Sequence, residues 1–112
     1  MDINGFGADL KNESQPENDK EKTQVRKRLL FFGRVQGVGF RYRLIRAAKS
    51  LGLVGWVKNK ADLSVEAEAQ GEEKKIRLLV KYMRSVSGPT VTKVQSRRLP
   101  TVEGEKDFIL RW

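Results

Sequence analysis

The residues best suited to chemistry form one run, from Gly33 to Arg41. Glycines stand at positions 33, 37 and 39 of this run. Glycine lets the backbone turn tightly and approach a ligand closely, so that successive N–H groups can point at one oxyanion. Arg41 adds a permanent positive charge and a planar fork of donors that suits phosphate. The run is therefore a candidate anion-binding loop.

The spacing of these glycines does not specify a nucleotide. It matches neither G-x-G-x-x-G nor G-x-x-x-x-G-K-[ST], so neither dinucleotide nor nucleoside-triphosphate binding follows. On spacing alone, a strand-to-helix turn whose glycines serve geometry only is an equally good interpretation.

Two residue types that carry much enzyme chemistry do not occur in this chain, which has no cysteine and no histidine. A thiol nucleophile, a disulfide framework, the usual zinc sites and His-based triads are therefore excluded. The carboxylates show no spacing typical of a metal-binding loop. We accordingly predict no metal site and no cofactor.

The loop must be positioned by the elements on either side of it. Leu29 to Phe32 is an apolar run typical of a buried strand, and apolar residues recur at helical spacing from Leu44 to Leu51. The order is therefore strand, loop, helix. The N-terminus of that helix would add the positive end of its dipole to the anion site.

The rest of the chain supplies five more elements. Leu53–Val57 predicts a second strand, Lys58–Asp62 a hairpin loop, and the alternation of Leu63–Gln70 a third strand. Apolar residues at Ile76, Leu79, Val80 and Met83 predict a second helix, which Gly88-Pro89 should end. Two further strands are expected at Thr90–Arg98 and Asp107–Trp112.

This βαββαβ order predicts an α+β fold, the ferredoxin-like sandwich. Its antiparallel sheet would carry both helices on one face and gain an extra C-terminal strand. The expected core positions on the helices are Leu44, Ala48, Leu51, Ile76, Val80 and Met83. Because this sandwich hosts many activities, the fold alone does not predict the function.

The chain divides at about residue 25. Residues 1–24 hold only scattered apolar residues, and we predict a disordered N-terminal extension. They carry three lysines and six acidic residues, a net charge of −3, whereas residues 25–112 carry 20 basic and 8 acidic residues, a net charge of +12. Solubility, steering of small anions and nucleic-acid binding could each explain the basic charge. Opposite charges also raise the hypothesis that the extension folds back on the domain.

The sequence shows neither a secretory signal nor an apolar run of membrane-spanning length. The absence of cysteine is compatible with a reducing compartment. We therefore expect a cytoplasmic protein that does not bind membranes.

Two runs carry a resemblance to a known family. Gly33–Tyr42 reads GRVQGVGFRY and Gly52–Asn59 reads GLVGWVKN. They resemble the first and second signatures of the acylphosphatase family, in the right order and at the expected distance. The similarity covers roughly Arg26 to Trp112. It implies metal-free hydrolysis of the carboxyl-phosphate bond of an acyl phosphate to a carboxylate and inorganic phosphate, by an enzyme that we expect to be a monomer.

The resemblance also implies a site. Arg41 matches the arginine that binds the phosphate, and Asn59 matches the asparagine that holds the attacking water. Backbone N–H groups would complete the phosphate cradle; they belong to Gln36, Gly37, Val38, Gly39 and Phe40. The side chain of Gln36 is expected to be structural. Leu63 stands where the family usually has a glycine, which predicts a differently shaped turn.

Two other functions are compatible with parts of the sequence. A small RNA-binding module would use the basic charge and the same type of fold. The glycines lie in a strand-to-helix loop, however, and the strands show no clear pair of exposed aromatic residues, so nucleic acid is the less favoured partner. A non-catalytic acylphosphatase-like domain in carbamoyl-phosphate chemistry is a further alternative, usually found in longer chains.

Overall fold

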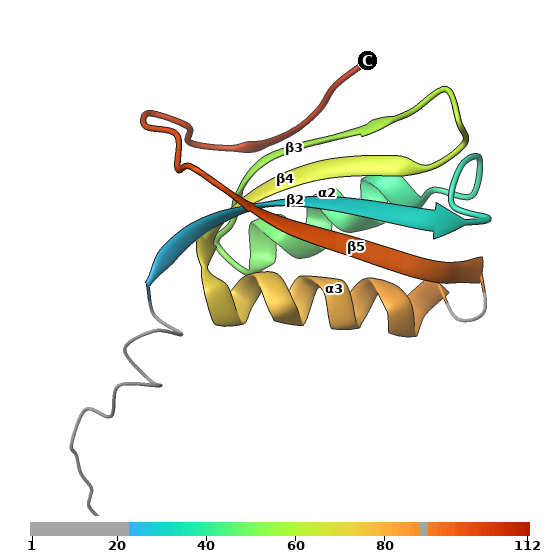
Figure 1. The fold of residues 1–112 in the computed structure, drawn as a ribbon, viewed down its shortest axis with the longest axis horizontal. Coiled ribbons are helices and arrows are strands. Elements are labelled where there is room, and N and C mark those ends of the chain that lie inside the picture. The colour runs from blue at the N-terminus through green and yellow to red at the C-terminus, as the bar shows by residue number, and fades with distance from the viewer. Residues whose placement is uncertain (1–22, 88–89) are drawn as a thin grey trace, which may run out of the picture.

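Two helices cover one face of a five-stranded sheet in the computed structural model (Figure 1). The structure describes residues 23–87 and 90–112. The elements are β2 (Gln24–Gly33), α2 (Phe40–Ser50), β3 (Val54–Asn59), β4 (Val65–Glu72), α3 (Glu73–Ser87), β5 (Val91–Leu99) and β6 (Phe108–Leu110). None of the helices in the described ranges has the length and apolar character needed to cross a membrane.

The sheet has the strand order β5-β2-β4-β3-β6. The first four strands in this order pair antiparallel, whereas β6 pairs with β3 in parallel. This arrangement confirms the predicted ferredoxin-like sandwich with its extra C-terminal strand. Strands β5 and β6 lie at opposite edges of the sheet, and the connection between them passes along one end of it. Strand β6 therefore runs opposite to β5, which is the direction of β3, and the two pair in parallel.

The core lies between the sheet and the helices. Alternate residues of the central strands point into it, among them Leu29, Phe31, Val65, Ala67 and Ala69. Of the core positions predicted on the helices, Leu44, Ala48, Ile76 and Met83 are buried. Leu51 and Val80 are only partly buried at its margin. Burial of each large apolar side chain contributes about 1.5–3 kcal/mol, which makes this layer the main source of stability.

Strand boundaries differ from the prediction on both sides of the β3–β4 turn. Strand β3 continues to Asn59 because Lys58 and Asn59 still pair with residues of β4. Strand β4 begins at Val65 because Leu63 has φ +75°, a left-handed conformation that cannot continue a strand. Asn59 therefore sits on the last rung of the ladder and not in the loop.

Some predictions fall at or beyond the limits of the described residues. We predict residues 1–24 to be a disordered extension, and residues 1–22 of it lie outside the described residues. Gly88-Pro89, where we predict that the second helix ends, also lies outside them. Strand β2 begins at Gln24, one residue before the predicted start of the domain, and Gln24 pairs with Glu72 of β4.

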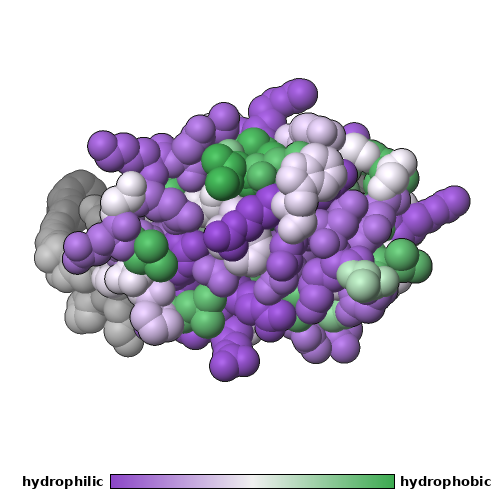
Figure 2. All heavy atoms as spheres, turned by 90° about the horizontal axis from the view of Figure 1, so that it is seen from above, coloured by the Kyte–Doolittle hydropathy of each residue, from purple (hydrophilic) through white to green (hydrophobic). Residues whose placement is uncertain are grey.

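Hydrophilic side chains cover much of the face shown in Figure 2, with smaller apolar areas between them.

Candidate functional site

The predicted anion-binding loop connects β2 to α2. Gly37 and Gly39 have φ +75° and +77°, values that glycine adopts without strain. Gly39 is also the N-cap of α2, which has neither a side-chain cap nor an acidic residue in its first turn. The first N–H groups of the helix are thus left without the side-chain acceptors that usually satisfy them. An anion at this end would be favoured by those N–H groups and by the helix dipole.

The two ends of the loop are held firmly. Val35 and Phe40 are buried, and the ring of Phe40 packs edge-on against that of Phe31 with 5.1 Å between centroids. The backbone N–H of Arg34 donates to the carbonyl oxygen of Thr90 at 2.7 Å. Gly33 lies so close to the same carbonyl that any Cβ would overlap it. Between these anchors, residues 37–39 are exposed to solvent.

The side chain of Gln36 joins the loop to the β3–β4 turn. Its Nε2 donates to the carbonyl oxygens of Lys60 at 2.8 Å and Ser64 at 2.9 Å. Both N–H bonds of the amide are therefore used on the turn that follows Asn59. This geometry fits the structural part expected for the Gln36 side chain, and it holds the two candidate halves of the site together.

The turn is closed by its own hydrogen bonds. Oδ1 of Asp62 accepts from the backbone N–H of Ser64 at 3.0 Å and from its hydroxyl at 2.5 Å. These two hydrogen bonds lower the pKa of Asp62 below its usual value, so the carboxylate is charged at neutral pH. Leu63 takes the left-handed conformation of this turn although it is not a glycine, and its side chain is 67% exposed.

Arg41, the second residue of α2, is half-buried. Its guanidinium carbon lies 5.5 Å from the centroid of the Trp112 ring, and no acidic residue in the described ranges pairs with it. Trp112 reaches this position because the Arg111 N–H donates to the Val57 carbonyl at 2.8 Å, which prolongs the β6–β3 pairing. The sequence patterns gave no signal for Trp112 as a neighbour of Arg41.

Asn59 ends β3 next to Lys60, whose carbonyl Gln36 binds. Its Oδ1 is buried and accepts no hydrogen bond from any described residue. An unpartnered buried oxygen costs about 1–3 kcal/mol, so it calls for an explanation other than stability. The structure thus brings the loop and the turn together through Gln36, although no hydrogen bond in the described ranges joins Arg41 directly to Asn59.

The outer face of the sheet does not present the stacking surface that RNA binding would need. Trp56 is only 7% exposed, because Lys58 and Arg111 lie over its ring. The neighbouring strand β4 carries Glu66 and Glu68, whose carboxylates pair with arginines of β2. The ring of Trp56 and the charges of Arg26 and Arg28 on this face therefore already have partners within the fold.

Metal ligands do not cluster in the part of the chain that the structure describes. Residues 23–87 and 90–112 contain no group of three or more His, Cys, Asp or Glu side chains that could hold an ion. The polar groups predicted for the site are backbone N–H groups, the guanidinium of Arg41 and the amide of Asn59.

Comparisons with known proteins relate the sequence and the fold of the chain to one family. The sequence model of one family, described as Acylphosphatase, matches residues 27–110. The acylphosphatase of Clostridium beijerinckii is 40% identical over 81 residues, which make up 71% of this chain and 90% of that protein. The crystal structure of acylphosphatase from Bacillus subtilis is 34% identical, with a TM-score of 0.73, and the match covers 79% of this chain and 99% of the other. For an acylphosphatase structure from Coxiella burnetii the identity is 35%, the TM-score 0.70, and the coverage 83% and 98%.

Proposed function

Because the chain belongs to the acylphosphatase family and is an enzyme that hydrolyses acyl phosphates, we propose that Arg41 binds the phosphoryl group and Asn59 orients the attacking water, without a metal ion. The observation that carries this proposal is the position of Arg41. Arg41 is the second residue of α2, whose N-terminus has no side-chain cap, and it comes directly after a loop in which two glycines have positive φ. No acidic side chain among the described residues pairs with its guanidinium.

The reaction asks for positioning and charge neutralisation more than for covalent chemistry. An acyl phosphate is an activated mixed anhydride, and its leaving carboxylate needs no proton. As the bond from the water oxygen to phosphorus forms, the bond from phosphorus to the acyl oxygen breaks, and the proton of the water passes to the released phosphate. Fixed donors that match the charge of the phosphoryl oxygens stabilise such a transition state.

Each candidate group has a distinct part in this step. The fork of Arg41 would bind two phosphoryl oxygens, and the N–H groups from Gln36 to Phe40 would bind the third. Asn59 would hold the water through its side-chain amide, whose Oδ1 has no hydrogen-bond partner in the described ranges. An amide suits this part because it does not titrate and can both donate and accept.

The test is steady-state hydrolysis of benzoyl phosphate in the presence of a chelator. We expect the wild type to keep its turnover, and Arg41→Ala to lose about 10³-fold or more in kcat/KM, as for an arginine that stabilises phosphoryl transfer. Asn59→Ala should lose about 10²–10³-fold, mainly in kcat. Arg46→Ala, an exposed arginine of the same helix, is the matched control and should hydrolyse at the wild-type rate.

Inorganic phosphate separates binding from catalysis. As a product it should inhibit the wild type and the Asn59→Ala variant competitively, and it should inhibit Arg41→Ala much more weakly. Activity that the chelator abolishes would contradict the metal-free mechanism. Activity that survives in a folded Arg41→Ala variant would contradict the part given to that residue.

A further inference from the structure

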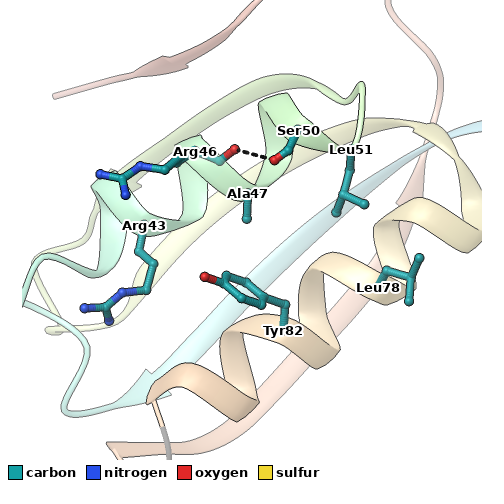
Figure 3. Close-up of a pocket in the computed structure, with 7 residues that line it drawn as sticks. All are labelled: Arg43, Arg46, Ala47, Ser50, Leu51, Leu78 and Tyr82. Atoms are coloured by element: carbon teal, nitrogen blue, oxygen red, sulfur yellow. Dashed lines mark hydrogen bonds between the residues drawn. The ribbon is translucent and has the colours of Figure 1, made fainter.

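A groove of about 470 Å³ runs between the two helices, away from the candidate catalytic site (Figure 3). Seven residues line it: Arg43, Arg46, Ala47, Ser50, Leu51, Leu78 and Tyr82. None of them belongs to the anion-binding loop or to the β3–β4 turn. Figure 3 shows the α2 residues on one side of the groove and the Leu78 and Tyr82 side chains on the other.

The α3 wall of the groove is unusually apolar for a surface. Leu78 and Tyr82, which line the groove, are 40% and 44% exposed, and Val86, one turn beyond them on the same helix, is 41% exposed. Because they are four residues apart, they form one stripe along the helix, which we call the α3 stripe. The core is made by other residues of α3, namely Ile76, Leu79 and Met83. A contiguous exposed apolar strip of this kind commonly marks an interaction site.

The α2 wall carries positive charge that the described part of the chain leaves unpaired. Arg43 and Arg46 have no acidic partner in residues 23–87 and 90–112. Elsewhere the carboxylates are used, with Arg26, Lys27, Arg28 and Lys49 among their partners. An apolar stripe beside two arginines that have no acidic partner among the described residues is complementary to an apolar segment that carries acidic residues.

The first 22 residues of the same chain contain both apolar and acidic residues, and the apolar ones are confined to one part of this segment. All their apolar residues fall within the first ten positions: Met1, Ile3, Phe6, Ala8 and Leu10. Asp2 and Asp9 flank the larger ones. Residues 11–22 contain no apolar residue, so this stretch has the composition of a hydrophilic spacer.

The spacer is long enough to bring these ten residues to the groove. The carbonyl of Thr23 accepts from the N–H of Glu73 at 3.3 Å, so the chain enters the domain beside the start of α3. The groove opens toward this end, where Leu51 after α2 faces Leu78. Twelve residues span about 20 Å as a flexible chain and about 40 Å when extended, against a length of about 16 Å for α2.

We propose that residues 1–10 dock into the α2–α3 groove of their own chain. The apolar side chains of Ile3, Phe6 and Leu10 cover the α3 stripe. Asp2 and Asp9 lie near Arg43 and Arg46 of α2. Tethering supports this occupant over a separate one, because a linker of twelve residues would hold the segment at an effective concentration in the millimolar range.

Paramagnetic labelling tests the proposal in the full-length chain. Since the chain has no cysteine, Ser14→Cys creates a single site for a nitroxide next to the docking segment. We expect the label to remove most of the amide NMR signal of Ala47, Leu78 and Tyr82. The signals should return in the Ile3→Ser/Phe6→Ser/Leu10→Ser variant. The matched control, Asn12→Ser/Gln15→Ser/Asn18→Ser, changes only the spacer and should keep the broadening.

Other outcomes would overturn the proposal. Broadening centred on residues 36–41 would mean that charge alone takes the acidic segment to the phosphate site. Broadening of unlabelled ¹⁵N protein by an equimolar amount of labelled ¹⁴N protein would mean that a second copy provides the segment. An absence of broadening beyond the residues next to the label would mean that the segment is undocked. None of these readouts depends on the hydrolytic mechanism.

Discussion

At the scale of single residues, Gln36 shows how much of the site depends on a side chain that need not touch the substrate. Its two N–H bonds hold the carbonyls of Lys60 and Ser64, and Asn59 is adjacent to the first of these. A displacement of about 1 Å between reacting groups can cost about 10²-fold in rate. We therefore expect Gln36 to act as a positioning residue for the proposed site, with an effect that appears through Asn59.

Gln36→Leu tests this dependence. The change removes both hydrogen bonds, which should cost about 1–3 kcal/mol in the free energy of unfolding and about 10²-fold in kcat. In the Asn59→Ala variant, the Gln36→Leu change should lower kcat much less, because the Asn59 side chain that Gln36 positions is already absent. The exposed Gln95→Leu is the matched control for both measurements. Equal losses in the presence and absence of Asn59 would contradict positioning.

Leu63 is a second residue whose backbone has an energetic consequence. Its φ of +75° costs roughly 1–2 kcal/mol in a residue with a Cβ, whereas glycine adds about 0.5–1 kcal/mol of chain entropy to folding. Relief of strain exceeds the entropy term, so Leu63→Gly should raise the free energy of unfolding by about 0.5–1 kcal/mol. Leu63→Ala keeps the Cβ and should change little. Denaturant titration of both variants distinguishes them, and equal stabilities would refute the strain argument.

At the scale of elements, the contact between β3 and β4 depends on a glycine. Gly55 has φ +143°, and a Cβ there would overlap the carbonyl oxygen of Glu68 on the neighbouring strand. Because β3 ends in Asn59, any shift of this strand also moves the site. The same strand carries Trp56 on its outer face and Val57 in the core.

Gly55→Ala should therefore lower the free energy of unfolding by about 2–5 kcal/mol, the sum of backbone strain and overpacking. Gly52→Ala is the matched control, since Gly52 also has positive φ (+73°) but faces open space. It should cost only about 1–2 kcal/mol. Thermal melts of the two variants check the difference, and similar losses would show that the clash with β4 relaxes.

Element order was the part of the structure that the sequence predicted best, because apolar periodicity is a local property. The buried positions Leu44 and Ile76 on the helices and the alternation after Val65 can be predicted without knowing which elements lie next to one another. The end of β3 cannot, since Lys58 and Asn59 belong to the strand only through their pairing with β4. For the same reason, the parallel direction of β6 and the approach of Trp112 to Arg41 could not be predicted from local patterns.

At the scale of the whole molecule, the few carboxylates of the domain are spread over links between elements. Glu73 at the start of α3 pairs with Lys27 of β2 and Arg98 of β5, and Asp107 pairs with Lys49. Hydrogen bonding to Lys27 lowers the pKa of Glu73, and hydrogen bonding to the Phe108 N–H lowers that of Asp107. With a net charge of +12 on residues 25–112, these links also offset mutual repulsion.

The lowered carboxylate pKa values determine in which direction the free energy of unfolding changes with pH. The folded state holds fewer protons than the unfolded state, so these groups stabilise the fold above their ordinary pKa values of about 3.8–4.5. The free energy of unfolding should be level between about pH 6 and 8 and should fall as the pH drops below about 4.5. Urea titrations across this range measure it. In the Glu73→Gln variant, the free energy of unfolding should fall less steeply below about pH 4.5. An unchanged slope would contradict the stabilising contribution of Glu73.

The sheet also gives the molecule two optical reporters in contrasting surroundings. Trp56 lies beneath Lys58 and Arg111 and is shielded from water, whereas Trp112 is 91% exposed with its ring facing the guanidinium of Arg41. Iodide should therefore quench the emission of Trp112 much more strongly than that of Trp56. The loss of shielding at Trp56 should signal unfolding, while the emission of Trp112 should respond to an anion that binds Arg41. One chain thus carries separate intrinsic fluorescence signals for folding and for anion binding.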